Sequence, residues 1–268
     1  VLIAIVVIFK RYTRLHLQHL SFIQVRELCR RSLPYALLIL LMGIYMRSDA
    51  LLLERMDGAA VSSRYAEAYR ILDALNMLGF LLAGILLPMF SRLLAQGHPV
   101  AELVRVSVNL IFSIALGVTA HSFFYNREIM TLLDHHAAPE LPQIYLVVIA
   151  AFPVYGLTYV YSTLLTANNN IRLLIGIALV AIVLSIGLNL LLIPRFHAIG
   201  AGIAALCVQC WVAGASLYFS SRKFGWPMFT LRLFKWLLLF ALLCLANAGW
   251  HALHLPLVPS VACDMVLF

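Results

Sequence analysis

Five charged or polar residues that could form a binding site lie inside two consecutive apolar stretches. Arg47 and Asp49 occur in the stretch MRSDALLL, and Arg70, Asp73 and Asn76 occur in AEAYRILDALN. A charge at the bilayer centre costs at least about 2.5–3.5 kcal/mol, so such residues usually face a protein interior or a water-filled cavity. Guanidinium groups donate paired hydrogen bonds to phosphate oxygens. The pattern therefore predicts that these side chains are paired with one another or face a water-filled cavity, and not lipid.

Two interpretations of this cluster stay open. In the first, the charges form ion pairs near the outer membrane surface that fix the packing of two helices. In the second, they line or gate the outward half of a translocation cavity. Arg47 and Arg70 would then bind an anionic head group, while Asp49 and Asp73 would hold the arginines or bind a coupling cation. At 1.5 Å per residue, Asp49 and Arg70 lie about 8 Å below the outer edge of their predicted helices.

The composition requires an apolar solvent. Of 268 residues, 63% are hydrophobic and 11% are charged, and the mean hydropathy is +0.97. An ordinary soluble domain is roughly 45–50% apolar and about 25% charged. We therefore expect an all-α, polytopic membrane helix bundle in contact with lipid, with no nucleic-acid partner. Since no loop is long enough to form a catalytic domain, we expect no enzyme activity, no catalytic residue and no metal site.

Seven segments are long enough to cross the hydrocarbon core, which needs about 20 mostly apolar residues. The predicted spans are Leu33–Leu53, Ala66–Leu93, Val104–Phe124, Ile144–Thr166, Ile171–Ile193, Ile199–Ser220 and Lys235–Leu253. Between the fifth and sixth, Pro194–His197 predicts a surface turn, since proline ends a helix. Small residues after this turn predict close packing on a neighbouring helix. They are Gly200, Ala201, Gly202, Ala204 and Ala205.

The basic residues predict the orientation. Most would face one side of the membrane, and this side is cytoplasmic by the positive-inside rule. They are Lys10, Arg11, Arg14, Arg26, Arg30, Arg31, Arg92, Arg105, Arg172, Arg222, Lys223, Arg232 and Lys235. The opposite side would hold Arg55, Arg64, Arg127 and Arg195. The net charge of +8 is therefore explained by topology and by anionic lipid head groups.

Both chain ends carry partial apolar runs, so we expect an internal piece of a longer transporter. The division that we expect is the end of a truncated helix at 1–9 and a basic cytoplasmic connection at 10–32. A six-helix lobe would follow at 33–225, with an additional helix and a truncated final helix at 226–268.

Three motifs resemble lipid-linked oligosaccharide flippases. The stretch RYAEAYRILDALNMLGFLLAGILLPMFSRLL is similar to a helix of that family with a proline-terminated end followed by serine and a basic residue, here Pro88, Ser91 and Arg92. The preceding stretch, with Pro34 and Asp49, resembles the helix before it. LNLLLIPRFHAIGAGIAAL is similar to the family's asparagine-containing helix, Ile-Pro corner and Gly-Ala-rich helix, although the family usually has glycine where His197 stands.

The resemblance places the chain in the multidrug/oligosaccharidyl-lipid/polysaccharide exporter superfamily, whose members have 12 or 14 helices in two lobes around a cavity. It implies the second lobe plus the helices that follow. The implied function is alternating-access export of a polyprenyl-diphosphate-linked sugar across the inner (cytoplasmic) membrane, for lipopolysaccharide of the O-antigen type. Implied partners are a polysaccharide polymerase and glycosyltransferases, with no cofactor beyond a coupling cation. A cation-coupled multidrug antiporter and a membrane-embedded glycan-modifying enzyme are the alternatives.

Overall fold

A computed structural model describes residues 22–133, 138–225, 236 and 239–248, and all regular structure in these residues is helical. The helices are α2 (Phe22–Asp57), α3 (Ala59–Ala95), α4 (Ala101–Phe124), α5 (Asn126–Leu133), α6 (Leu141–Ile149), α7 (Phe152–Ala167) and α8 (Ile171–Phe224). A shorter apolar helix covers Leu239–Ala248. The predicted all-α fold is confirmed.

Five helical stretches are long and apolar enough to cross a membrane. They are Arg26–Asp57, Ala59–Ala95, Ala101–Phe124, Leu141–Ala167 and Ile171–Phe224. Large apolar side chains cover their outer surface, as Ile39, Phe80 and Val183 show with 70%, 73% and 71% exposure. Such a surface is stable against lipid tails, which confirms the polytopic membrane bundle. The predicted seventh span, Lys235–Leu253, lies partly outside the described residues.

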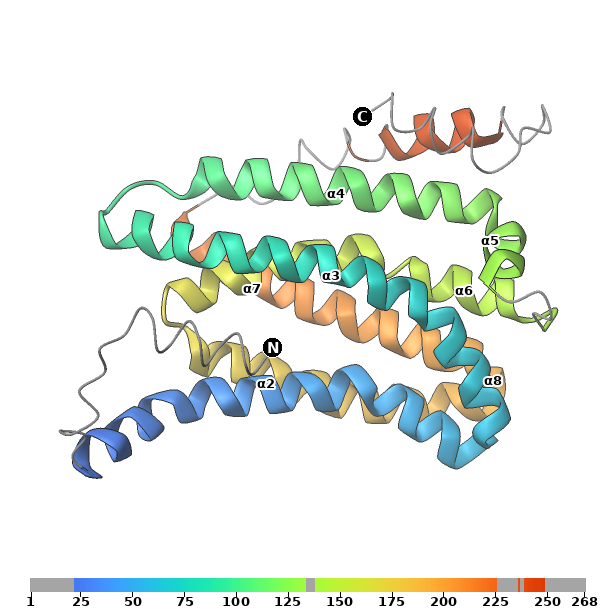
Figure 1. The fold of residues 1–268 in the computed structure, drawn as a ribbon, viewed down its shortest axis with the longest axis horizontal. Coiled ribbons are helices and arrows are strands. Elements are labelled where there is room, and N and C mark those ends of the chain that lie inside the picture. The colour runs from blue at the N-terminus through green and yellow to red at the C-terminus, as the bar shows by residue number, and fades with distance from the viewer. Residues whose placement is uncertain (1–21, 134–137, 226–235, 237–238, 249–268) are drawn as a thin grey trace, which may run out of the picture.

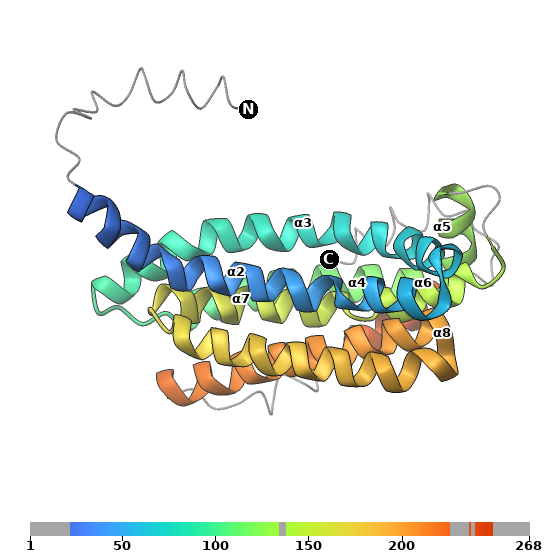
Figure 2. The same ribbon diagram turned by 90° about the horizontal axis from the view of Figure 1, so that it is seen from below.

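The long helices run side by side along one direction (Figures 1 and 2). The central helix is α7, which packs against α3, α4 and α8, and α2 packs against both α3 and α8. The short α5 turns across the bundle at the end where α2 meets α3. We call this end the turn end; it holds the α2–α3 turn at Gly58, α5 and the reversal inside α8.

The α8 hairpin reverses within the predicted Pro194–His197 turn, at its last residue. Helical structure continues through Pro194, and the backbone leaves the helical region at His197, with φ 51° and ψ −131°. Two contacts show that the chain reverses there. An ideal Cβ on Gly200 would lie 2.5 Å from the Leu192 carbonyl oxygen, and Trp211 Nε1 donates a hydrogen bond to the Ile177 carbonyl oxygen at 3.4 Å. The prediction that Pro194 ends the helix is therefore wrong.

The predicted span Ile144–Thr166 is interrupted near its middle. The α6 helix ends at Ile149 and α7 begins at Phe152, with Ala150 and Ala151 in between. Pro153 lies at the start of α7 and has no N–H to continue the hydrogen-bond ladder. The two halves still form one apolar stretch, Leu141–Ala167.

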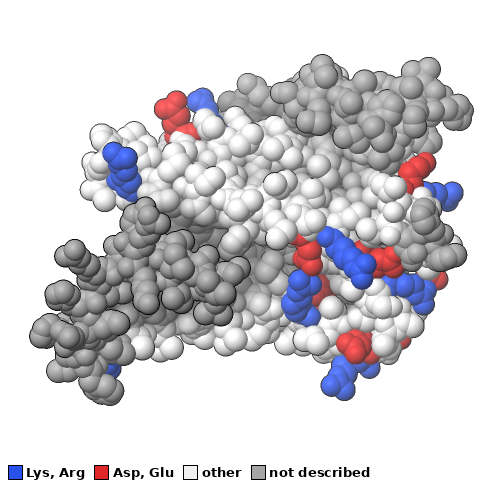
Figure 3. All heavy atoms as spheres, viewed as in Figure 1, with Lys and Arg blue, Asp and Glu red and all other residues white. Residues whose placement is uncertain are grey.

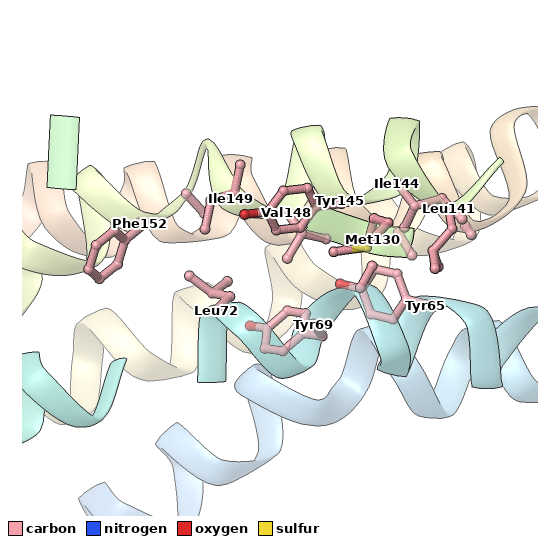
Figure 4. Close-up of a cluster of buried hydrophobic side chains, with 14 of the residues drawn as sticks. Tyr65, Tyr69, Leu72, Met130, Leu141, Ile144, Tyr145, Val148, Ile149 and Phe152 are labelled. Atoms are coloured by element: carbon pink, nitrogen blue, oxygen red, sulfur yellow. The ribbon is translucent and has the colours of Figure 1, made fainter. Parts of the chain in front are cut away.

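The main core lies between α3 and α6, with Met130 of α5 closing it (Figure 4). Tyr65, Tyr69 and Leu72 of α3 face α6 residues that include Tyr145. The small-residue face of α8 packs inward as predicted, since Gly200, Ala201, Gly202 and Ala204 are buried and Ala205 is half-buried. An added Cβ at Gly202 would lie 3.1 Å from Val147 Cγ1 of α6, so the two backbones approach closely.

Candidate substrate-binding site

Charged side chains gather over α2 and α3 toward the turn end (Figure 3). Of the acidic residues that the structure describes, Glu27 and Glu102 alone belong to the opposite half of the bundle. The others are Asp49, Glu54, Asp57, Glu67, Asp73, Glu128 and Glu140. Arginines lie among them, and Arg64 Nη1 is 3.1 Å from Glu140 Oε2. The surface of this half therefore has mixed charge, whereas the opposite half is mainly basic.

Arg47 and Asp73 form an ion pair between α2 and α3. The Arg47 Nη2 atom lies 3.1 Å from Asp73 Oδ2, and the two side chains are 61% and 45% exposed. The antiparallel packing of α2 on α3 brings these residues together although they are 26 positions apart. One guanidinium nitrogen is thus held by Asp73, while much of the group remains open to a ligand.

The Arg47 guanidinium also lies over the aromatic ring of Tyr69. Arg47 Cζ lies 5.8 Å from the centroid of the Tyr69 ring, within the roughly 6 Å range of a cation–π contact. Tyr69 is itself buried, and its hydroxyl lies 3.0 Å from the hydroxyl of Tyr155 on α7. Arg47 is therefore connected to both α3 and α7.

Asp49 has a buried environment distinct from that of Arg47. Its carboxylate accepts hydrogen bonds from the Tyr65 hydroxyl at 2.6 Å and from the Ala50 backbone N–H at 2.9 Å. The residue is 4% exposed, and the Tyr65 ring contacts that of Tyr69 with centroids 5.6 Å apart. Asp49 thus joins α2 to α3 inside the protein and is not placed for direct contact with a ligand.

A second polar contact joins α2 to α8 in the interior. Ser48 and Ser185 share a hydrogen bond of 2.7 Å, and the Asn189 amide donates to the Ser185 carbonyl oxygen at 2.8 Å. All three residues are buried. These contacts satisfy the two hydroxyls and the Asn189 N–H, which would otherwise be costly in an apolar interior, whereas Asn189 Oδ1 has no partner among the described residues.

The two other predicted site residues differ in exposure. Arg70 is exposed, and within the described part of the chain it forms no ion pair. Asn76 is 8% exposed, and its side-chain oxygen has no hydrogen-bond partner among the described residues. The structure therefore pairs Arg47 with Asp73, leaves the Arg70 side chain exposed and buries the Asn76 side chain.

The arrangement can bind an anion better than a metal ion. Two arginines offer exposed guanidinium groups, which form charge-assisted hydrogen bonds to anionic oxygens. In the described ranges, no group of three or more His, Cys, Asp or Glu side chains could hold a metal ion.

Sequence reasoning overlooked the tyrosines that support the site. Tyr65 and Tyr69 lie four residues apart on one face of α3, and Tyr155 lies on α7. In an apolar sequence, such tyrosines look like ordinary core residues. Their spacing gives no signal that separates them from core residues, because their contacts depend on how α3 packs against α2 and α7.

Comparison with known proteins concerns the first third of the chain, which carries Arg47, Asp49, Arg70 and Asp73. Residues 1–94 match the family model described as "Polysaccharide biosynthesis protein". The match spans 94 of 268 residues and includes α2 and nearly all of α3. No curated protein matches the chain. The long apolar helices support a multi-pass membrane protein, and its N-terminal third is similar to the polysaccharide biosynthesis family.

Proposed function

We propose that this chain is the substrate-binding lobe of a flippase that exports a polyprenyl-diphosphate-linked oligosaccharide by alternating access. The observation that carries the proposal is the Arg47 guanidinium, which lies exposed in an apolar stretch with Asp73 and Tyr69 holding it in place. The family match over α2 and α3 supports polysaccharide as the cargo class.

The chemistry of such a cargo explains the residue types. A diphosphate cannot enter hydrocarbon without compensation, because an isolated charge there is very costly. Arg47 and Arg70 can donate paired hydrogen bonds to its oxygens, and arginine suits this role because its planar fork matches phosphate geometry. The polyprenyl tail can stay in the bilayer, against the apolar side chains that cover the helices. The charged head group then moves along the protein while the tail remains in lipid.

The rest of the assignment follows from this cargo. A second lobe would supply the opposite wall of the cavity, and the membrane would be the cytoplasmic one, where lipid-linked sugars are made on the inner face. Glycosyltransferases would supply the cargo and a polysaccharide polymerase would consume it. A coupling cation could drive the cycle.

The test measures export and protein abundance in one strain that carries the full-length protein. Arg47→Ala and Arg70→Ala should each abolish export of the lipid-linked sugar while membrane abundance stays normal. Arg55→Ala is the matched control, since Arg55 is another exposed arginine of α2 and forms no ion pair within the described ranges. It should export normally.

The competing structural interpretation predicts a different pair of results. If the arginines serve packing alone, their loss should lower the amount of folded protein, and any residual protein should export at the normal rate per molecule. Normal export and normal abundance in both alanine variants would contradict the proposal.

A further inference from the structure

We infer that Tyr69 and Tyr155 are positioning residues that fix the Arg47 guanidinium in the orientation that binds the diphosphate. The inference rests on the proposed function, because it assigns a role to residues behind the same site. Neither tyrosine is exposed enough to be a principal ligand, since Tyr69 is 6% and Tyr155 is 5% exposed.

The contacts form a chain across three helices. Arg47 of α2 lies over the ring of Tyr69 on α3, and the Tyr69 hydroxyl meets that of Tyr155 on α7. The Tyr65 ring lies against Tyr69 from the preceding helical turn. The Tyr69 ring is therefore held at its hydroxyl and beside its face, and it offers a fixed platform for the cation.

A fixed platform matters because arginine has a long, flexible side chain. Asp73 holds one nitrogen of Arg47, but a single contact at 3.1 Å leaves the group free to rotate about that point. The Tyr69 ring adds a second constraint, the plane over which the guanidinium lies. Two constraints define the direction of the remaining N–H donors, so less freedom is lost when a diphosphate binds.

A packing role alone predicts different behaviour. Removing a buried hydroxyl from a packing tyrosine lowers stability but leaves the affinity of a distant site unchanged. Tyr145 provides the comparison within the same core. Its hydroxyl shares a buried hydrogen bond of 2.7 Å with Ser122, and neither residue contacts Arg47.

The experiment measures the dissociation constant of inorganic pyrophosphate for the purified full-length protein by calorimetry. Arg47→Ala should weaken binding strongly. Tyr69→Phe, which keeps the ring, and Tyr155→Phe, which keeps Tyr69 intact, should each weaken it about three- to tenfold, the range that one hydrogen bond contributes. Tyr145→Phe should leave the constant unchanged. Adding Tyr69→Phe to Arg47→Ala should cause no further loss, because the tyrosine acts through the arginine.

The possible results test the positioning role of the tyrosines and the proposed function separately. If Arg47→Ala weakens binding while the Tyr69 and Tyr155 variants behave like Tyr145→Phe, the positioning role is wrong and the proposed function stands. If wild-type protein does not bind pyrophosphate, or Arg47→Ala binds it normally, the proposed function fails. A larger drop in melting temperature for Tyr69→Phe and Tyr155→Phe than for Tyr145→Phe, with an effect that persists in the Arg47→Ala background, would assign them to packing and overturn the inference.

Discussion

His197 Nδ1 lies 2.9 Å from Asp57 Oδ2, and this contact joins the two sharp turns of the turn end. Asp57 ends α2 and precedes Gly58, which has φ 87°, while His197 itself has φ 51°. A positive φ is favourable for glycine but costs other residues roughly 1–2 kcal/mol. The contact with Asp57, which is 14% exposed at its side chain, offsets part of this cost.

The melting temperatures of His197 variants should therefore follow how well each new residue tolerates a positive φ. We expect His197→Gly to melt close to the wild-type temperature, because relief of the backbone strain at positive φ offsets the lost contact with Asp57. His197→Val should melt lower by about 2–8 °C, since a β-branched residue is poorly suited to this backbone region. Thermal unfolding of the purified protein checks the order. Equal melting temperatures for the two variants would show that the turn stores no strain.

Gly202 should not tolerate a large side chain. An added Cβ would already lie 3.1 Å from Val147 Cγ1, so Gly202→Leu would force α8 away from α6. Overpacking of this kind costs typically about 1–3 kcal/mol and should lower both the melting temperature and the membrane abundance. Gly214→Leu on the same helix is the control, because no atom lies within 4 Å of the corresponding Cβ. If both leucine variants accumulate normally, α8 does not pack tightly against α6 at Gly202.

Asp49 and Tyr65 should be energetically coupled. Asp49→Ala leaves the buried Tyr65 hydroxyl without its acceptor, and an unsatisfied buried group costs about 1–3 kcal/mol. Tyr65→Phe removes the hydroxyl instead. We expect the double variant to be more stable than the sum of the single effects indicates, by about 1 kcal/mol or more. Chemical unfolding in detergent measures the cycle, and strict additivity would mean that the 2.6 Å contact contributes nothing.

Asp73 should affect function more than stability. An exposed ion pair contributes about 0–1 kcal/mol, so Asp73→Asn should leave membrane abundance unchanged. Export should fall, although less than in Arg47→Ala, because the guanidinium remains but its hydrogen-bond partner on α3 loses its negative charge. The comparison requires export assays of both variants at matched abundance. Export by Asp73→Asn at the wild-type rate would show that the ion pair does not prepare Arg47 for its ligand.

The fold could be predicted from composition and apolar run length because hydrocarbon permits few backbone structures. The helices of a span must satisfy their own hydrogen bonds, so 63% hydrophobic residues in long runs determine the class. The exact boundaries could not be predicted in the same way. Pro194 suggested a helix end, yet the reversal occurs at His197, since a turn depends on backbone angles that residue type only favours.

The site was predicted in part for a similar reason. Charges in apolar runs are conspicuous, and antiparallel helices bring such residues to the same level, as Arg47 and Asp73 show. The contrast between exposed Arg47 and buried Asp49, two residues apart, depends on which helix face packs inward. Tyr69 and Tyr155 could not be distinguished from core residues, because their role depends on contacts between α3 and α7 that no local pattern records. The role of these residues in binding stays a prediction.

The pairing of Arg47 with Asp73 also has an electrical consequence. A charge that moves through the whole membrane potential changes in energy by about 2.3 kcal/mol per 100 mV. The two residues carry opposite charges and lie 3.1 Å apart, so a movement of both along the membrane normal transfers no net charge. This pair by itself therefore contributes no voltage dependence. Any effect of voltage on the proposed cycle must come from other charges, such as Arg70, which forms no ion pair within the described part of the chain.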